Sequence, residues 1–173
     1  EATERQDVPP ASKPEKLSIK QLWTNAEVSD PGNMLLVPGK RKQIIVMAGW
    51  NQVAVLDIDG KLNRRVKLEL PADDGVSVLR AGKSEKDRAL LAATTRGGRR
   101  AFVFDFAGKR IAQYPAKPSP SSSITDVVLA DLNNDKRPEL IVGWQGNVGI
   151  HSVDMQGRRQ WTNRAMSGVF AMS

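Results

Sequence analysis

The chain alternates between short apolar runs and polar turns, and this alternation recurs at a period of nearly fifty residues. Each period holds a segment in which apolar and polar positions alternate, and a shorter, more apolar segment precedes it. Both patterns predict β-strands. The alternating segments end in the motif Asp-apolar-x-Gly, whose glycines, Gly60, Gly108 and Gly157, are 48 and 49 residues apart. This spacing indicates an internal repeat.

The expected strands fall into three sets with the same order in each period. The alternating strands run over 53–57, 101–105 and 150–154, the apolar strands before them over 44–48, 90–94 and 140–142, and further short strands follow the glycines, for example over 62–70 and 109–114. Gly97-Gly98 and Gly146-Asn147 lie between apolar runs, where such pairs predict tight hairpin turns.

A second match gives the phase of the repeat. Trp23-Thr24-Asn25 recurs as Trp161-Thr162-Asn163, 138 residues later, which is three periods of 46. The chain is therefore expected to hold the last strand of one unit, three whole units, and the opening of another at 167–172. A unit of ~40–50 residues with four short strands has the size of a β-propeller blade.

We therefore predict an all-β fold of about three four-stranded antiparallel blades plus partial strands. Since propellers have ~4–8 blades, we expect these to be part of a larger propeller. The units are placed roughly at 33–74, 75–123 and 124–166, within a repeat domain spanning 17–173. Residues 1–16, rich in Pro, Ala and charge, are predicted to be a flexible linker. The alternative is an ordinary β-sandwich with accidental similarity between its segments.

Composition narrows the function classes. The 173 residues include no cysteine, which excludes disulfides and thiolate metal sites. No apolar run approaches the ~20 residues of a transmembrane segment. The net charge of +7 suggests nucleic-acid binding, but the basic pairs lie once or twice per unit in or beside expected turns, which favours solvated turn charges. No nucleic-acid partner is expected, and a protein or polymer partner stays unidentified.

One segment has the pattern of a cation site. Between residues 131 and 139, oxygen-bearing groups occupy alternate positions just before an apolar strand. The expected ligands are the side chains of Asp131, Asn133, Asp135 and Glu139 and the backbone carbonyl of Arg137. This is the ligand set that Ca²⁺ prefers, and the crowded carboxylates repel one another unless a cation or solvent neutralises them. The matching stretches 38–43 and 81–88 lack alternating oxygens, so a single Ca²⁺ site is predicted.

Residues 127–143 resemble the FG-GAP or VCBS repeat of integrin-type β-propellers. In that family, the pattern Asp-x-(Asp/Asn)-x-Asp-Gly-x-x-(Asp/Glu) binds Ca²⁺ in a loop between adjacent strands of a blade, so the resemblance implies the same ligand residues. Asn134 and Lys136 depart from it, because the family often has glycine at the first position and strongly prefers it at the second. The alternative is a metal-free loop held by Asx-turn hydrogen bonds.

From Leu17 onward, the chain resembles the propeller region that follows a thioredoxin-like (redoxin) domain in some exported bacterial proteins, planctomycete ones in particular. The residues that carry this resemblance are 22–25, 31–33, 159–164 and the Asp-x-x-Gly units. It implies an extracytoplasmic location, periplasmic or secreted, and association with an upstream thioredoxin-like domain. There is no Cys-x-x-Cys, so no redox activity is implied.

Catalytic chemistry finds little support, and neither catalytic nor cofactor-binding residues are predicted. The one histidine, His151, lies in an alternating strand and is interpreted as an ordinary strand residue. No Gly-x-Ser-x-Gly elbow is present. The repeated Asp57, Asp105 and Asp154 are interpreted as turn-forming acceptors. The four tryptophans form two repeat-matched pairs, which favours packing between blades.

We therefore expect a non-catalytic β-propeller module that binds a partner or serves as a scaffold, with Ca²⁺ stabilising one loop. Two alternatives stay open. One is an accessory C-terminal domain of an exported thioredoxin-like redox protein. The other is a fragment of a quinoprotein-type propeller enzyme, which the segment from Asp154 to Trp161 faintly resembles.

Overall fold

The computed structural model describes residues 18–37, 42–84, 86 and 88–172. The linker predicted over 1–16 lies outside the described residues. The described chain forms twelve strands and one short 3₁₀ turn, η1 (Gly146–Val148). The strands are β1 (Pro31–Val37), β2 (Gln43–Ala48), β3 (Gln52–Asp57), β4 (Leu62–Lys67), β5 (Val76–Lys83), β6 (Ala89–Thr95), β7 (Ala101–Asp105), β8 (Arg110–Tyr114), β9 (Ile124–Ala130), β10 (Glu139–Trp144), β11 (Ile150–Val153) and β12 (Arg159–Asn163).

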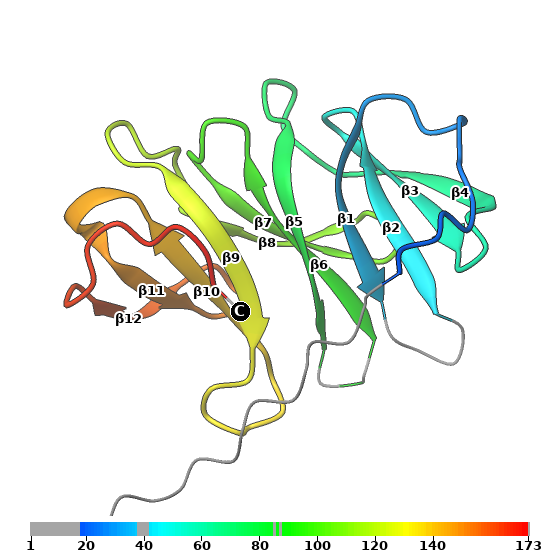
Figure 1. Ribbon diagram of the computed structural model, residues 1–173. Helices are drawn as coiled ribbons and strands as arrows, with labels where there is room; N and C mark the ends of the chain where they lie inside the picture. Colours follow the sequence, from blue (N-terminus) through cyan, green and yellow to red (C-terminus); the bar gives the residue numbers. More distant parts are fainter. Residues whose placement is uncertain (1–17, 38–41, 85, 87, 173) are drawn as a thin grey trace, which may run out of the picture.

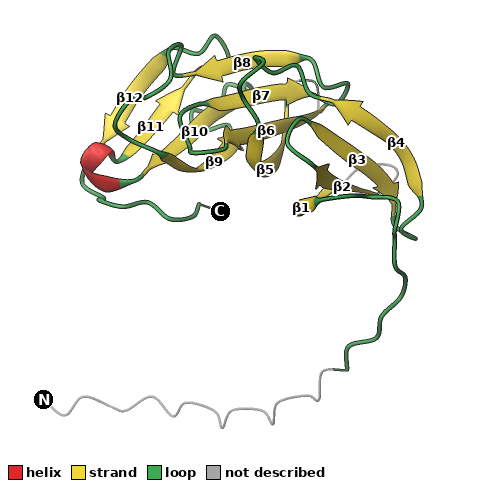
Figure 2. Ribbon diagram, turned by 90° about the horizontal axis from the view of Figure 1, so that it is seen from above, coloured by secondary structure: helices red, strands yellow, loops and turns green. Residues whose placement is uncertain are grey.

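The strands form three separate sheets of the same design. Each sheet has four antiparallel strands joined in chain order, β1 to β4, β5 to β8 and β9 to β12, here called blades 1, 2 and 3. Figure 1 shows the blades fanned side by side. Seen from above, they form an open arc with β1, β5 and β9 on its concave side and β4, β8 and β12 on its convex side (Figure 2). This arrangement of consecutive propeller blades confirms the predicted all-β propeller fold.

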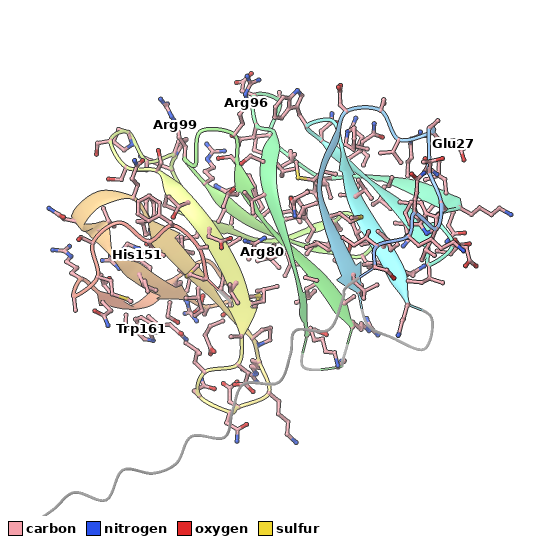
Figure 3. The ribbon with its side chains drawn as sticks, in the orientation of Figure 1. Glu27, Arg80, Arg96, Arg99, His151 and Trp161 are labelled. Carbon is pink, nitrogen blue, oxygen red and sulfur yellow. The ribbon has the colours of Figure 1, made fainter. Side chains whose placement is uncertain are left out.

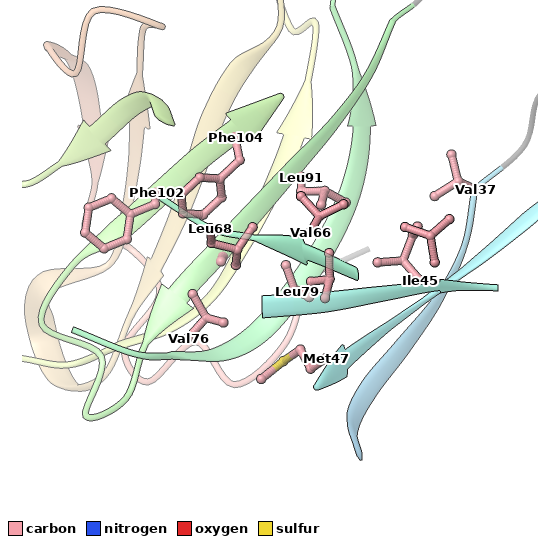
Figure 4. Close-up of a cluster of buried hydrophobic side chains, with 13 residues drawn as sticks. Val37, Ile45, Met47, Val66, Leu68, Val76, Leu79, Leu91, Phe102 and Phe104 are labelled. Atoms are coloured by element: carbon pink, nitrogen blue, oxygen red, sulfur yellow. The ribbon is translucent and has the colours of Figure 1, made fainter. Parts of the chain in front are cut away.

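The hydrophobic core lies between the blades. Ile45 and Met47 of blade 1 pack against Leu79, Phe102 and Phe104 of blade 2, all buried (Figure 4). A second cluster joins the facing sides of blades 2 and 3. Strands β2, β6 and β10 are nearly continuous apolar runs because both of their faces are covered. Burial of these faces, at roughly 25 cal/mol per Å² of apolar surface, is the main force that holds the blades together.

Polar side chains connect the inner strands at intervals of 46 residues. The side-chain amide of Asn33 on β1 donates to the carbonyl of Leu79 on β5 at 2.9 Å and accepts from its amide at 2.8 Å. The carboxylate of Asp126 on β9 accepts from Arg80 of β5 and from the amide of Met172, both at 2.9 Å. These bonds repeat from one blade to the next, and they fix how far neighbouring inner strands are shifted along their length relative to each other.

Candidate functional site

The candidate metal loop joins β9 to β10 at one end of blade 3 (Figure 1). Glu139 is the first residue of β10 and is paired with Ala130 of β9, so the two strands hold both ends of the loop. The Glu139 side chain is buried (4% exposed), whereas residues 131–137 are exposed.

Hydrogen bonds draw the predicted ligand side chains into one network. The side-chain nitrogen Nδ2 of Asn133 donates to Oε1 of Glu139 at 3.1 Å and to Oδ2 of Asp135 at 3.3 Å. The carboxylate of Asp131 accepts from the backbone amides of Asp135 (3.2 Å) and Lys136 (2.8 Å). Asp135 in turn accepts from the amide of Arg137 at 2.8 Å. All five predicted residues therefore belong to one compact loop.

The backbone of the loop has two left-handed residues. Asn134 has φ of 61° and Lys136 has φ of 70°. These are the positions at which the sequence departs from the glycine of the family pattern. Asn tolerates this conformation, whereas for lysine it costs roughly 1–2 kcal/mol. The loop therefore adopts left-handed backbone angles at both positions, and only the lysine opposes them.

The donor chemistry of the loop fits a calcium ion. Calcium takes carboxylate, amide and carbonyl oxygens, and the side chains of Asn133, Asp135 and Glu139 already meet. The amide NH₂ of Asn133 lies between two carboxylates; rotation of this amide by half a turn would present its oxygen instead. Among the described residues, no three Asp, Glu, His or Cys side chains converge as a ready metal site.

A cavity of about 460 Å³ lies beside this loop, between blades 2 and 3. Leu90, Ile111 and Met155 form its apolar part. Polar groups border it on both sides: Asp135, Arg137 and Glu139 from the candidate metal loop, and Asp154, Gln156, Arg158 and Gln160 from the turn and strand that follow β11. A change in the loop would therefore reshape one wall of this cavity.

The three repeated aspartates form turns, as predicted. Each accepts hydrogen bonds from the backbone amides two and four residues ahead, at 2.9–3.1 Å for Asp57, Asp105 and Asp154. At Asp154, burial alone would raise the carboxyl pKa. Hydrogen bonds from the backbone and guanidinium of Arg158 outweigh it and lower that pKa.

The single histidine is a buried member of β11 that faces blade 2 (Figure 3). Its Nδ1 lies 2.8 Å from the hydroxyl of Tyr114 and accepts from the indole N–H of Trp144 at 3.1 Å. Since an indole nitrogen only donates, Nδ1 is the acceptor and the neutral ring carries its proton on Nε2. That nitrogen is buried and has no hydrogen-bond partner. Burial, followed by the charges of Arg159 and Arg164, lowers the pKa of His151 to about 4.

The tryptophans do not all have the predicted packing role. Trp144 is buried (4% exposed) between blades 2 and 3, as expected. Trp50 is 54% exposed, so its assignment to the core is wrong; its ring lies 4.4 Å from the guanidinium of Arg96. The reason is the strand register. The amide of Gly49 donates to the carbonyl of Asp30 in blade 1, as the amide of Gln145 donates to the carbonyl of Ser123 in blade 3. Gly49 therefore corresponds to Gln145, so Trp50 corresponds to the turn residue after Gln145 and not to Trp144.

Comparisons with known proteins support the fold and leave the family open. No family model and no curated protein matches the chain. Among solved structures it is similar to a protein of unknown function from Bacteroides caccae, at 15% identity and a TM-score of 0.46, over 69% of this chain and 39% of that one. It is also similar to BBS1N, solved in complex with ARL6DN, at 10% identity and a TM-score of 0.53, over 90% of this chain and 46% of that one.

The chain thus spans less than half the length of both solved structures. BBS1N is a β-propeller, so the similarity supports the propeller fold. Among the residues that the structure describes, no helix has the length and apolar character of a membrane span.

Proposed function

We propose that the chain is a non-catalytic β-propeller module that binds a protein or polymer partner, with one Ca²⁺ ion stabilising the loop between β9 and β10. The observation that carries the calcium proposal is the loop itself. Three carboxylates and one amide share a single hydrogen-bonded network on a backbone with two left-handed residues.

The role proposed for the ion is to neutralise the charge of the loop carboxylates. Asp131, Asp135 and Glu139 bring three negative charges into nine residues, against positive charges on Lys136 and Arg137. Two like charges about 4 Å apart repel by about 4 kcal/mol at the effective dielectric constant of a protein surface. A divalent cation would remove this repulsion. Because the loop connects the first two strands of blade 3, it would also hold β9 and β10 in register.

The absence of catalysis is part of the proposal. Its support is that the one histidine uses Nδ1 in bonds to Tyr114 and Trp144 and is buried away from solvent. We further propose an extracytoplasmic location and association with an upstream thioredoxin-like domain. Both rest on the resemblance from Leu17 onward.

The test is thermal unfolding with Ca²⁺ and with chelator, for the unaltered chain and for Asp131→Ala/Asp135→Ala. A ligand at ~100 times its dissociation constant adds ~2.7 kcal/mol to the folded state. The calcium-dependent rise in midpoint should vanish in the double variant and persist in Asp59→Ala, an exposed acid in another turn. Equal midpoints with calcium and chelator in the unaltered chain would refute the calcium site.

A further inference from the structure

The outer strands of blades 1 and 2 contact the next blade at one recurring point. The backbone of Lys67 on β4 lies against Gly108 of blade 2, and Gln113 on β8 lies against Gly157 of blade 3. In both places a methyl group on the glycine would overlap the facing carbonyl oxygen. The amide of Glu69 also donates to the carbonyl of Gly108 at 2.8 Å. The glycine of the Asp-x-x-Gly turn is therefore where blades 2 and 3 each pack on the outer strand of the blade before.

Blade 1 uses the same docking point with a different covering segment. The ring of Trp23 lies against Gly60, where an added methyl group would overlap it. The indole of Trp23 donates to the carbonyl of Ile58 at 3.0 Å, and the side-chain amide of Asn25 donates to that of Gly60 at 2.8 Å. The oxygen of Asn25 accepts from the amide of Glu27 at 2.8 Å, which fixes its orientation. Trp23 and Asn25 thus bind an Asp-x-x-Gly turn through ring packing and two hydrogen bonds.

The same three residues recur on β12 at the far end of the arc. Asn163 accepts from the amide two residues ahead, Ala165, at 2.9 Å, just as Asn25 does. Trp161 is paired with Ser152. Since neighbouring residues on a strand face opposite sides and His151 faces blade 2, Trp161 points away from blade 2 (Figure 3).

This second copy of the motif holds nothing in the structure. Trp161 is 43% exposed. In the described part of the chain, neither its indole N–H nor the side-chain amide of Asn163 donates a hydrogen bond. The inner half of the blade 3 face that carries Trp161 is covered by the C-terminal segment. The amide of Gly168 donates to the carbonyl of Gly146 at 2.9 Å, as the amide of Val76 at the start of β5 donates to the carbonyl of Trp50. Trp161 lies on the outer half of this face, where a turn would dock, and is partly exposed.

We infer that Trp161 and Asn163 form a docking site for a β-hairpin of the Asp-x-x-Gly type that belongs to a further propeller blade. The reason is the repetition of one contact. The glycine of an Asp-x-x-Gly turn is covered by the preceding segment three times in the described chain. Strand β12 is the preceding segment for a fourth such turn, and it carries the same Trp and Asn residues that cover the first. The inference names a partner class for the proposed binding module and so rests on that function.

The test uses NMR spectra of the full chain in chelator, so that a failure of calcium binding does not affect it. The probe is a cyclised peptide of residues 101–114, the β7–β8 hairpin, whose folding is checked first. We expect saturable shifts of the Trp161 indole and Asn163 amide signals. A peptide with Gly108→Ala should bind at least about tenfold more weakly, since its methyl group would overlap the ring. Trp161→Ala should weaken binding similarly, whereas Trp50→Phe should not.

Three results would overturn the inference. One is the absence of shifts at millimolar peptide, and another is equal shifts with the Gly108→Ala peptide. The third is sedimentation that shows self-association through Trp161 without peptide, because the occupant would then be a second copy of this chain. None of these results bears on calcium binding, which the unfolding experiment decides separately.

Discussion

Lowering the pH from about 7 to about 4.5 should destabilise the folded chain through one buried side chain, His151. Burial lowers the pKa of this histidine most, and the charges of Arg159 and Arg164 add repulsion. In the folded chain Nδ1 already accepts from Trp144, and Nε2 has no hydrogen-bond partner. The folded chain therefore binds a proton at His151 only near pH 4, whereas the unfolded chain binds one near pH 6.5.

The sign and size follow from this difference. Between the two pKa values the unfolded state holds more protons, so stability falls as the pH drops and this contribution levels off below about 4. A pKa difference of about 2.5, at 1.36 kcal/mol each, gives a loss of about 3.4 kcal/mol in full and about 2.5 kcal/mol by pH ~4.5.

The assay is urea unfolding at several pH values, for the unaltered chain and for His151→Asn. Asn keeps an acceptor near the position of Nδ1 and does not titrate. Since other acidic groups titrate in both proteins, the difference between their unfolding free energies isolates His151. That difference should shrink by about 2.5 kcal/mol as the pH falls to ~4.5. Parallel pH profiles of the two proteins would refute this reasoning.

Three further predictions concern the backbone and the inter-blade contacts. Lys136→Gly should raise the unfolding free energy in chelator by ~1 kcal/mol, because φ at this position is 70°; a loss of stability in urea unfolding would contradict it. Asp126→Ala should cost about 3 kcal/mol, since it leaves Arg80 and the Met172 amide without their acceptor; a change no larger than that of the exposed control Asp59→Ala would contradict it. Gly60→Ala should be more destabilising than Gly97→Ala and should shift the tryptophan emission, because both glycines have φ near 80° but only the first has a ring against it; equal effects would show that Trp23 is not docked there.

The sequence predicted the fold well because the same strand and turn patterns occur in three successive units. The apolar and alternating segments coincide with β2, β3, β6, β7, β10 and β11 to within a residue or two. The Asp-x-x-Gly turns need both an acceptor and a left-handed glycine, and Gly60, Gly108 and Gly157 all have φ of 77–85°. Such turns are set locally, so their sequence is enough to identify them.

Features that depend on register or on distant partners were less accessible. Gly49-Trp50 and Gly143-Trp144 look equivalent in sequence, but they occupy different positions in their blades. Gly146-Asn147 suggested a two-residue hairpin, but the turn after β10 is a 3₁₀ turn. Residues 22–25 were expected to be a strand; instead they cover blade 1 through side-chain bonds, with no sheet pairing.

The contacts of His151 also required the structure. Tyr114 and Trp144 come from strands β8 and β10, in different blades, and nothing in the sequence aligns them with β11. By contrast, the residues proposed as metal ligands could be selected from the sequence alone, since they lie within nine positions of one another; calcium binding by them stays a prediction.

Calcium binding by this loop is the central claim, and calorimetric titration of the full chain with Ca²⁺ tests it most directly. We predict one ion bound per chain, with no binding in Asp131→Ala/Asp135→Ala and tighter binding in Lys136→Gly. The absence of binding by the unaltered chain at millimolar Ca²⁺, or binding that survives in the double variant, would contradict the claim.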